Sequence, residues 1–379
     1  MHYFKKKSIL ITVLALALLV ISTTVAQATE YTEPDLNAIK SIIYHNNVEQ
    51  ITAEKLESKT LEELLKILDE HSKYYNPEEL HHLIERLTGE YSGIGAYVKE
   101  EEGRIYIVEP IKGSPAYRAK FRAGDEIFSV NWKSIRGMDL SEAVNLIRGK
   151  TGTRVVLGIR REGIEGTKLF SIKREQITIE PITYEIIEGI GYIRIHTFSE
   201  LTSTSFLNAT GELSAQGITS IVIDVRNNPG GSLDSVVEVS RLLVPKGPIV
   251  HIEYRDSKTT HVSFLRKPFF ENIVILVNER SASASEILAA AVQDTKVGTI
   301  IGTTTYGKGS VQRIYFLPGG GGFKQTEAIY LSPNKNIIDG IGITPDYIVE
   351  QELDSETDIQ LEFAIEYLNK RKINQEAAK

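Results

Sequence analysis

A short serine-rich segment is the first place where the sequence could do chemistry. Residues 281–286 read Ser-Ala-Ser-Ala-Ser-Glu, after an apolar run that ends at Val277 and before a helical run that begins at Ile287. A serine at a strand-to-helix turn can act as a nucleophile, because the N–H groups at the helix start face a developing oxyanion. Serine and glutamate there also make an ordinary N-cap and capping box, so this segment alone leaves both interpretations open.

A lysine between two glycines is the second candidate. Residues 306–312 read Tyr-Gly-Lys-Gly-Ser-Val-Gln and lie between strand-like stretches. The glycines allow close backbone approach, and a lysine amine that loses water in a tight site has a lowered pKa and can act as a base. A solvated loop lysine is the ordinary alternative. The segment also comes near a phosphate-binding loop, but Gly309 stands where that loop needs Ser or Thr, which argues against nucleotide.

A glycine turn at the end of a buried strand is the third candidate. Residues 224–231 read Asp-Val-Arg-Asn-Asn-Pro-Gly-Gly. Paired glycines let backbone N–H groups point at a ligand, as an oxyanion hole requires, but any tight turn uses them too. Taken alone, this segment indicates only a turn.

Hydrophobic periodicity predicts the elements that must position these segments. Residues 33–90 have helical spacing, with a stripe at Leu61, Leu64, Leu65 and Leu68 that could form intramolecular core or a dimer contact. Residues 91–175 show short β-like runs broken by turns. From 179 to 349, buried-strand runs alternate with helices, which predicts an α/β core with partly parallel strands, and residues 355–372 form an amphipathic helix.

The N-terminus is typical of a secretory signal. Lys5, Lys6 and Lys7 form a basic region, residues 9–21 are almost wholly apolar, and Ala-Gln-Ala at 26–28 offers a cleavage site after Ala28. The alternative is an uncleaved N-terminal anchor, which would tether the protein to a membrane. Both interpretations place the body of the protein outside the cytoplasm, in a secreted, periplasmic or cell-envelope location.

Composition excludes several kinds of partner and cofactor. The chain has 379 residues, 41% hydrophobic and 25% charged, which is ordinary for a globular protein. Its formal charge is −7, and removing the leader with its three lysines makes it −10, which argues against nucleic acid and anionic membranes as partners. Cysteine is absent, and the eight histidines show no metal-binding spacing, so we expect neither a metal nor another cofactor.

Together the three segments resemble the carboxyl-terminal processing peptidases, also called tail-specific proteases. In that family a serine in an S-A-S-x-E segment is the nucleophile and a lysine in a G-K-G-x-V-Q segment is the general base. The resemblance implies these roles for Ser283 and Lys308, and it implies that Gln312 orients the lysine amine. It also implies an oxyanion hole made by Gly230 or Gly231 with the Ala284 N–H.

Residues 91–175 resemble the PDZ domain of the same family. Gly93, Ile94, Gly95 and Ala96 match the loop whose N–H groups hold a C-terminal carboxylate while the peptide adds as a strand. The implied partners are proteins with apolar C-terminal tails. Arg148 stands where related proteases couple peptide binding to the active state, and a plain surface arginine is the alternative.

The prediction is therefore a mixed α/β, multidomain serine endopeptidase that is exported. The expected order is a signal peptide at 1–28, a helical region at 29–90, a PDZ domain at 91–175, a protease core at 176–350 and a helical tail at 351–379. The N- and C-terminal helices are candidates for a homodimer contact. The competing hypothesis is a non-catalytic PDZ adaptor that binds C-terminal tails.

Overall fold

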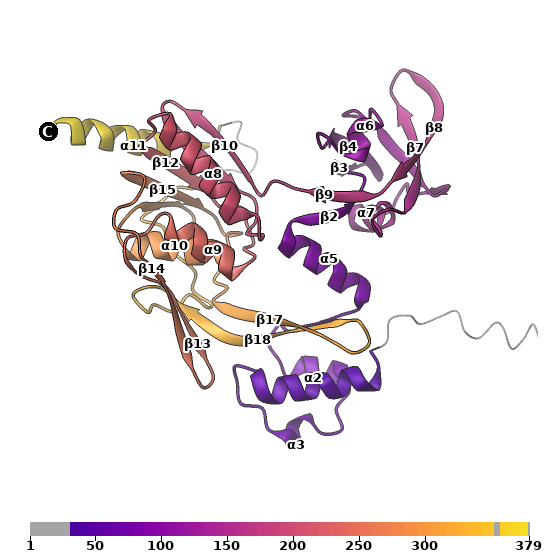
Figure 1. Cartoon of the computed structure of the whole chain (residues 1–379), viewed down its shortest axis with the longest axis horizontal. Coiled ribbons are helices and arrows are strands. Elements are labelled where there is room, and N and C mark those ends of the chain that lie inside the picture. The colour runs from indigo at the N-terminus through magenta and orange to yellow at the C-terminus, as the bar shows by residue number, and fades with distance from the viewer. Residues whose placement is uncertain (1–30, 352–356, 378–379) are drawn as a thin grey trace, which may run out of the picture. The chain divides into compact units, whose positions relative to one another are not determined.

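The computed structural model describes residues 31–351 and 357–377 (Figure 1). These residues form two compact units. One contains the chain up to Leu80 together with Gln312–Thr326, and the other contains His81–Val311 together with the chain from Glu327 onward. The expected leader, residues 1–28, lies outside the described residues. Within the described ranges, no helix is both long and apolar enough to span a bilayer.

The first unit is mainly helical, as the periodicity predicts. Its helices are α2 (Glu33–Asn46), α3 (Ala53–Leu56) and α4 (Leu61–Lys66). Thr32 and Thr60 begin α2 and α4, each with a capping box that satisfies N–H groups at the helix start. Its apolar core cluster consists of Ile39, Ile43, Ile51, Leu56, Leu61, Leu64, Leu317 and Phe323. The leucine stripe of α4 therefore packs inside the chain.

Strand β18 belongs to an antiparallel sheet. Its path is β1-β18-β13-β14, and β17 also pairs with β18. In the first unit the start of β18 pairs with β1, and in the second unit its last residues pair with β13. The helix-strand alternation of the sequence does not predict the β13–β14 hairpin. The bounds are β1 (Lys73–Tyr75), β13 (Gly247–Tyr254), β14 (Lys258–Ser263), β17 (Ser310–Phe316) and β18 (Gly322–Leu331).

The region expected to be a PDZ domain forms a small β-structure with its own core in the second unit. Its sheet runs β3-β4-β5-β7-β8, so β3 is an edge strand, and a separate ribbon pairs β2 with β9. Helix α5 (Pro77–Thr88) precedes it in the chain. The strands are β2 (Glu90–Gly93), β3 (Ala96–Glu101), β4 (Arg104–Pro110), β5 (Glu126–Val130), β6 (Lys133–Ser134), β7 (Arg154–Arg161), β8 (Ile164–Lys173) and β9 (Glu175–Thr178). The helices are α6 (Pro115–Arg118) and α7 (Leu140–Ile147).

A six-stranded sheet forms the centre of the α/β region. Its order is β10-β11-β12-β15-β16-β19, and every pair is parallel except β10 with β11. Strands β12 and β15 are buried along their whole length, which is why they read as continuous apolar runs. The strands are β10 (Ile182–Ile187), β11 (Ile190–Ile195), β12 (Ser220–Asp224), β15 (Asn272–Val277), β16 (Thr299–Gly302) and β19 (Tyr347–Ile348).

Helices cover both faces of this sheet (Figure 1). One large apolar cluster joins Ile221, Ile223 and Ile275 to the side chains of α8, α9 and α10. A second cluster packs Val222 and Val274 against α11, the amphipathic tail helix that the sequence predicts. These helices are α8 (Thr202–Ala215), α9 (Leu233–Arg241), α10 (Ala284–Asp294) and α11 (Ile359–Ala377). The mixed α/β fold expected from the sequence is confirmed.

Candidate active site

Ser283 lies at the turn between β15 and α10. It is the N-cap of α10, with φ 54° and ψ −113°, a conformation that costs a non-glycine residue about 1–3 kcal/mol. Two hydrogen bonds anchor this turn to the segment that follows β12. Ser281 Oγ donates to the Val225 carbonyl at 2.8 Å, and Ser285 Oγ donates to the Asn228 carbonyl at 2.9 Å. Ser283 itself is only partly buried. A strained, anchored and accessible serine fits the nucleophile interpretation.

Glu286 connects this turn to the lysine segment. Its carboxylate is fully buried, and its Oε2 accepts the Ser283 N–H at 2.8 Å and the Lys308 N–H at 2.9 Å. Its Oε1 accepts the Thr305 hydroxyl at 2.6 Å and the Gly307 N–H at 2.7 Å. The backbone nitrogens of Ser283 and Lys308 thus share one carboxylate oxygen. The capping-box interpretation is correct for Glu286, and the same side chain also joins two segments far apart in the chain.

The two glycines around Lys308 are required by close backbone contacts. Gly307 has φ 89°, and a Cβ there would lie 3.1 Å from backbone nitrogens of residues 341 and 342. A Cβ on Gly309 would lie 2.3 Å from the Asp339 backbone nitrogen. The Gly309 N–H donates to Asp339 Oδ1 at 2.9 Å. Lys308 is therefore held in a clamped turn, and it stays partly exposed.

The glycine turn at the end of β12 lies against the nucleophile. Gly230 has φ 100°, and a Cβ there would lie 2.8 Å from Ser283 Cβ and 2.9 Å from the Ala284 backbone nitrogen. The Gly230 N–H donates to Asn228 Oδ1 at 2.9 Å. Gly231 lies against Phe198 instead, where a Cβ would meet the carbonyl oxygen at 2.1 Å. The turn thus brings Gly230 beside Ser283, as the expected oxyanion hole requires.

A buried ion-pair network fixes the first half of the same turn. Arg226 Nη2 donates to Asp224 Oδ2 and to Asp358 Oδ2, both at 2.7 Å, and the Tyr192 hydroxyl donates to Asp224 Oδ2 at 2.7 Å. Asp224 is fully buried. Burial raises the pKa of Asp358, but hydrogen bonds from Arg226 and the Leu361 N–H outweigh burial and hold that pKa below its ordinary value. The network ties the turn to α11.

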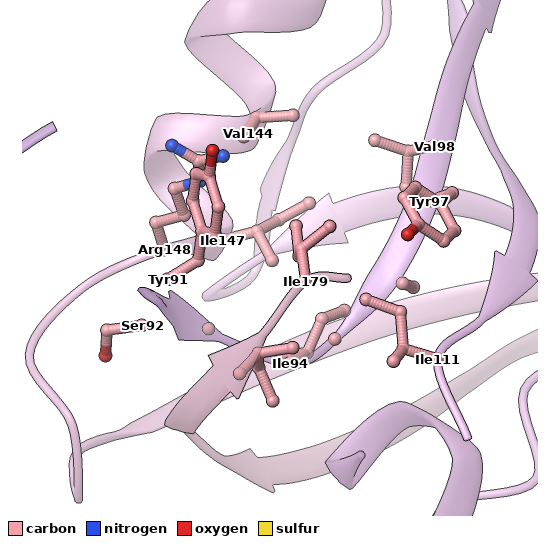
Figure 2. Close-up of a pocket in the computed structure, with 14 residues that line it drawn as sticks. Tyr91, Ser92, Ile94, Tyr97, Val98, Ile111, Val144, Ile147, Arg148 and Ile179 are labelled. Carbon is pink, nitrogen blue, oxygen red and sulfur yellow. The ribbon is translucent and has the colours of Figure 1, made fainter. Parts of the chain in front are cut away.

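A cavity of about 220 Å³ lies between β3 and α7 in the PDZ-like region (Figure 2). The four residues expected to bind a peptide carboxylate, Gly93, Ile94, Gly95 and Ala96, all line it. Gly95 has φ 73°, and a Cβ there would lie 2.3 Å from Ser114 Cβ, so this loop position needs glycine. The apolar lining residues are Ile94, Val98, Ile111, Val144, Ile147, Ile177 and Ile179.

Arg148 lies at one end of the cavity, beside Tyr91 (Figure 2). Its guanidinium is 4.9 Å from the centre of the Tyr91 ring, and its Nη1 is 3.6 Å from Glu85 Oε2. Glu85 is almost completely buried, and its Oε1 accepts the Ser92 N–H at 2.7 Å. Arg148 thus contacts Tyr91 at the cavity wall and, through Glu85, the backbone of strand β2.

Gln312 belongs to the first unit, whereas Ser283 and Lys308 belong to the second. Within its own unit, Gln312 Nε2 donates to Thr326 Oγ1 on the neighbouring strand at 3.3 Å. Its expected role toward the lysine amine stays a prediction.

Comparison with known proteins identifies the family. Residues 189–349 match peptidase family S41, and residues 106–161 match a PDZ domain. The carboxy-terminal-processing protease of Bartonella bacilliformis is 37% identical over 312 residues, which cover 79% of this chain and 71% of that protein. The chain belongs to the carboxy-terminal processing proteases. These are serine proteases, and the resemblance predicted from the motifs is confirmed.

One further curated protein and two solved structures are also similar to this chain. The processing protease CtpA of Bacillus subtilis is 38% identical over 296 residues, which cover 77% of this chain and 63% of that longer protein. The structure of a photosystem II D1 C-terminal processing protease aligns with a TM-score of 0.55 and 26% identity, over 87% of this chain and 97% of that one. A Streptococcus agalactiae lipoprotein shares the fold, with a TM-score of 0.51 and 13% identity over 92% of this chain and 99% of that one.

Sequence reasoning on this protease missed three contributors to the lysine segment. The Thr305 hydroxyl donates to Glu286, and Asp339 accepts the Gly309 N–H. The Tyr330 hydroxyl donates to the Lys308 carbonyl. The sequence carries no local signal for these contacts, because Asp339 and Tyr330 lie more than twenty residues along the chain from Lys308. Glu286 carried a signal, its place three residues after Ser283, but that spacing alone predicts only a helix cap.

Proposed function

We propose that the chain is an exported serine endopeptidase that recognises protein C-terminal tails and cleaves peptide bonds with Ser283 and Lys308. The observation that carries this proposal is the shared carboxylate of Glu286. It binds the backbone N–H groups of both residues, so the proposed nucleophile and the proposed base are built on one buried group. Such preorganised geometry is what general-base activation of a serine requires.

The reaction would proceed in two halves. The neutral Lys308 amine takes the Ser283 hydroxyl proton while Oγ bonds to the scissile carbonyl carbon, and the resulting ammonium then protonates the leaving amine as the C–N bond breaks. In the second half, water attacks the acyl-enzyme and gives a proton to Lys308. The ester bond then breaks, the carboxylic acid leaves, and the proton returns to Ser283. In this mechanism Gln312 orients the lysine amine.

Backbone N–H groups would stabilise the tetrahedral oxyanion. Ala284 is the first residue of α10, where N–H groups have no intrahelical acceptor. Gly230 lies against both Ser283 and the Ala284 nitrogen. We assign the oxyanion hole to the Ala284 N–H with Gly230 or Gly231. Gly230 is the glycine beside Ser283, but its N–H donates to Asn228 Oδ1 in this structure and would have to leave that acceptor to bind the oxyanion.

The cavity between β3 and α7 would hold the substrate tail. Because β3 is an edge strand, an extended peptide can add to it, and the loop at Gly93–Ala96 would bind the terminal carboxylate with its N–H groups. The aliphatic lining favours an apolar final side chain. Arg148 would then couple peptide binding in the cavity to the active state, through its contacts with Tyr91 and Glu85.

Two further properties complete the proposal. The basic and apolar leader at 1–28 would direct export and be cleaved after Ala28, and retention of the leader would instead leave a membrane tether. The terminal helices would offer the contact for a homodimer. Sedimentation of the mature chain at micromolar concentrations measures whether it forms this homodimer.

Cleavage of an unfolded protein with an apolar C-terminal tail tests the function. We expect the mature chain to cut it, and Ser283→Ala and Lys308→Ala each to lose several orders of magnitude in turnover, with losses that do not add in the double variant. A matched substrate whose final residues are changed to aspartate should be cut more slowly.

Failure of the parent chain to cut, together with equal tail binding by all three proteins, would favour a PDZ adaptor. For the proposed role of Arg148, an Arg148→Ala variant that is activated by substrate tails as strongly as the parent would leave that residue as a surface arginine.

A further inference from the structure

Asn228 is a fully buried residue in the glycine turn between β12 and α9. Its side-chain Nδ2 donates to the carbonyl of Ile195, the last residue of β11, at 2.8 Å, and its Oδ1 accepts the Gly230 N–H at 2.9 Å. A carbonyl can only accept and a backbone N–H can only donate, so these two partners leave the amide a single orientation. The side chain therefore ties the glycine turn to the end of a central strand.

The backbone of Asn228 also holds the β15–α10 turn. Its carbonyl accepts the N–H of Ala282 at 3.1 Å and the hydroxyl of Ser285 at 2.9 Å. These two donors lie on either side of Ser283 along the chain, so the turn that presents the proposed nucleophile is bonded to Asn228 both before and after the serine. One buried residue thus contacts the end of β11, the glycine turn and the β15–α10 turn.

Gly230 is the point where the glycine turn meets the β15–α10 turn. A Cβ on Gly230 would lie 2.8 Å from Ser283 Cβ and 2.9 Å from the Ala284 nitrogen, so the two turns are in close contact here. The Asn228 amide bonds this same glycine and thereby sets how the glycine turn faces the Ala284 N–H. Whichever glycine supplies the second oxyanion donor, its distance from Ser283 depends on the position of Gly230.

We propose that Asn228 is a positioning residue, whose side chain holds the glycine turn against the β15–α10 turn in the geometry that the oxyanion needs. Oxyanion stabilisation depends on donors that are fixed before the reaction, because donors that must reorganise lose much of their effect. A buried amide that is hydrogen-bonded at both its oxygen and its nitrogen supplies such a constraint. This inference rests on the proposed function, because an oxyanion forms only if Ser283 is the nucleophile.

Asn228→Asp keeps the shape of the side chain and changes its hydrogen bonding with pH. The carboxylate still accepts the Gly230 N–H, but its second oxygen faces the Ile195 carbonyl, and two acceptors repel each other. Burial raises the pKa of such a carboxyl, and the protonated acid again has an O–H donor for Ile195. The charged groups of the same turn, Asp224 and Arg226, pair with each other. The variant should therefore be slow at alkaline pH and approach the parent as pH falls.

Peptide cleavage at about pH 9 and about pH 6 compares the variant with the parent, and fluorophosphonate labelling to its end point counts the active sites. At the higher pH we expect kcat per labelled site about 10- to 100-fold below the parent with KM within about twofold, because the constraint acts on the transition state. At the lower pH the variant-to-parent ratio of kcat should rise at least about threefold. Affinity for a peptide aldehyde, which forms an oxyanion on reaction with Ser283, should fall by the same factor as kcat.

A matched control makes the same change at another buried amide of the same unit. Asn272 is 2% exposed, begins β15 at the opposite end of the strand from Ser283, and donates from Nδ2 to Ser220 Oγ at 3.2 Å. Asn272→Asp should lower stability but keep kcat per labelled site and aldehyde affinity within about twofold of the parent at each pH. Asn228→Ala removes both side-chain bonds and carries no titrating group, so it should be slow at both pH values.

The possible failures are distinguishable. A parent chain that neither cuts nor labels would contradict the proposed function itself. An active parent, with Asn228→Asp and Asn228→Ala equal to it in kcat per labelled site, would contradict the positioning role alone. A variant faster than the parent would show that the amide withholds the Gly230 N–H from the oxyanion, and would overturn the inference. An Asn228→Asp chain that is as slow as Asn228→Ala, or unlabelled, at both pH values would overturn it too, because the protonated acid must replace the amide.

Discussion

At the scale of single residues, the candidate site is organised by groups that bind backbone. Glu286 accepts N–H groups from Ser283, Gly307 and Lys308, and Asp339 accepts the next one, from Gly309. Glu286 is fully buried, so its hydrogen bonds must replace the hydration that the carboxylate loses, whereas Asp339 is exposed. Their value for catalysis is geometric, since neither carboxylate needs to touch a substrate.

Replacing Glu286 by glutamine tests the hydrogen bonds that its carboxylate accepts, because it leaves the packing of the side chain nearly unchanged. The amide has nearly the same shape, but its NH₂ group must face N–H donors that now lack an acceptor. We expect Glu286→Gln to lower turnover at least about 100-fold and to reduce the free energy of unfolding by about 2–4 kcal/mol. Glu279→Gln serves as control, because Glu279 is an exposed carboxylate near the same turn. Equal turnover of Glu286→Gln and parent would contradict the joining role.

The close approach at Gly309 leads to a second prediction. A methyl group there would overlap the backbone of Asp339, which cannot move aside as a flexible side chain can. Gly309→Ala should therefore displace the lysine turn and abolish cleavage, measured with a peptide substrate. Gly211, within α8, has open space around its Cβ position, so Gly211→Ala should keep full activity and raise stability by about 0.5–1 kcal/mol. A Gly309→Ala chain as active as the parent would show that the clamp is unnecessary.

At the scale of elements, the strained β15–α10 turn and the edge strand β3 belong to two different candidate sites. The β15–α10 turn presents Ser283 from the central sheet, whereas β3 and α7 line a cavity in the PDZ-like region. The two elements have separate apolar cores, so changes in one need not disturb the other's packing. Substrate selection and catalysis should therefore be separable by mutation.

Helix α7 offers a matched pair for this separation. Val144 lines the cavity, whereas Leu146 is not among the lining residues and is 39% exposed. Val144→Asp should weaken binding of a peptide with an apolar C-terminus at least about tenfold, because a carboxylate enters the aliphatic wall. Leu146→Asp should bind as the parent does. Fluorescence anisotropy with a labelled tail peptide measures both, and equal affinities for all three proteins would place the tail elsewhere.

At the scale of the whole molecule, long-range ties connect the C-terminal helix to the central sheet. Arg226 bridges Asp224, at the end of β12, to Asp358, just before α11. Arg226 is 9% exposed and Asp224 is buried, whereas Asp358 is 40% exposed. The outer half of the network is therefore screened by solvent and contributes less than the inner half.

This tie predicts a pH dependence of stability. The pKa of Asp358 is lower in the folded chain than its ordinary value of about 3.9. A depressed carboxylate pKa stabilises the fold above the unfolded pKa, and that contribution is lost as pH falls through the folded pKa. Asp358→Asn should therefore cost about 1 kcal/mol at neutral pH, and the difference should shrink below about pH 4. Urea unfolding at several pH values measures it.

The control for Asp358 lies on the same helix. Glu366 pairs with Lys370 at the surface, and Glu366→Gln should change stability by less than about 0.5 kcal/mol at every pH. A difference between Asp358→Asn and parent that stays constant down to pH 3 would contradict the assigned shift.

The sequence alone was sufficient for the buried central strands, the tail helix and the motif residues. Continuous apolar runs identified β12 and β15, because strands covered on both faces carry few polar side chains. The order and spacing of the three motifs identified the family, which the comparisons confirm. The domain boundaries and the roles of Ser283, Lys308 and Gln312 stay predictions.

Only the tertiary structure decided which groups surround the lysine segment. Tyr330 and Asp339 reach it through the pairing of β18 and the path of the following loop, and a one-residue slip of β18 would turn Tyr330 to the opposite face. The β13–β14 hairpin was likewise not predicted; its own pairing is local, but its place in the sheet depends on the pairing of β13 with the distant strand β18. Local patterns specify which side chains and elements exist, whereas sheet register and close backbone packing decide which of them meet.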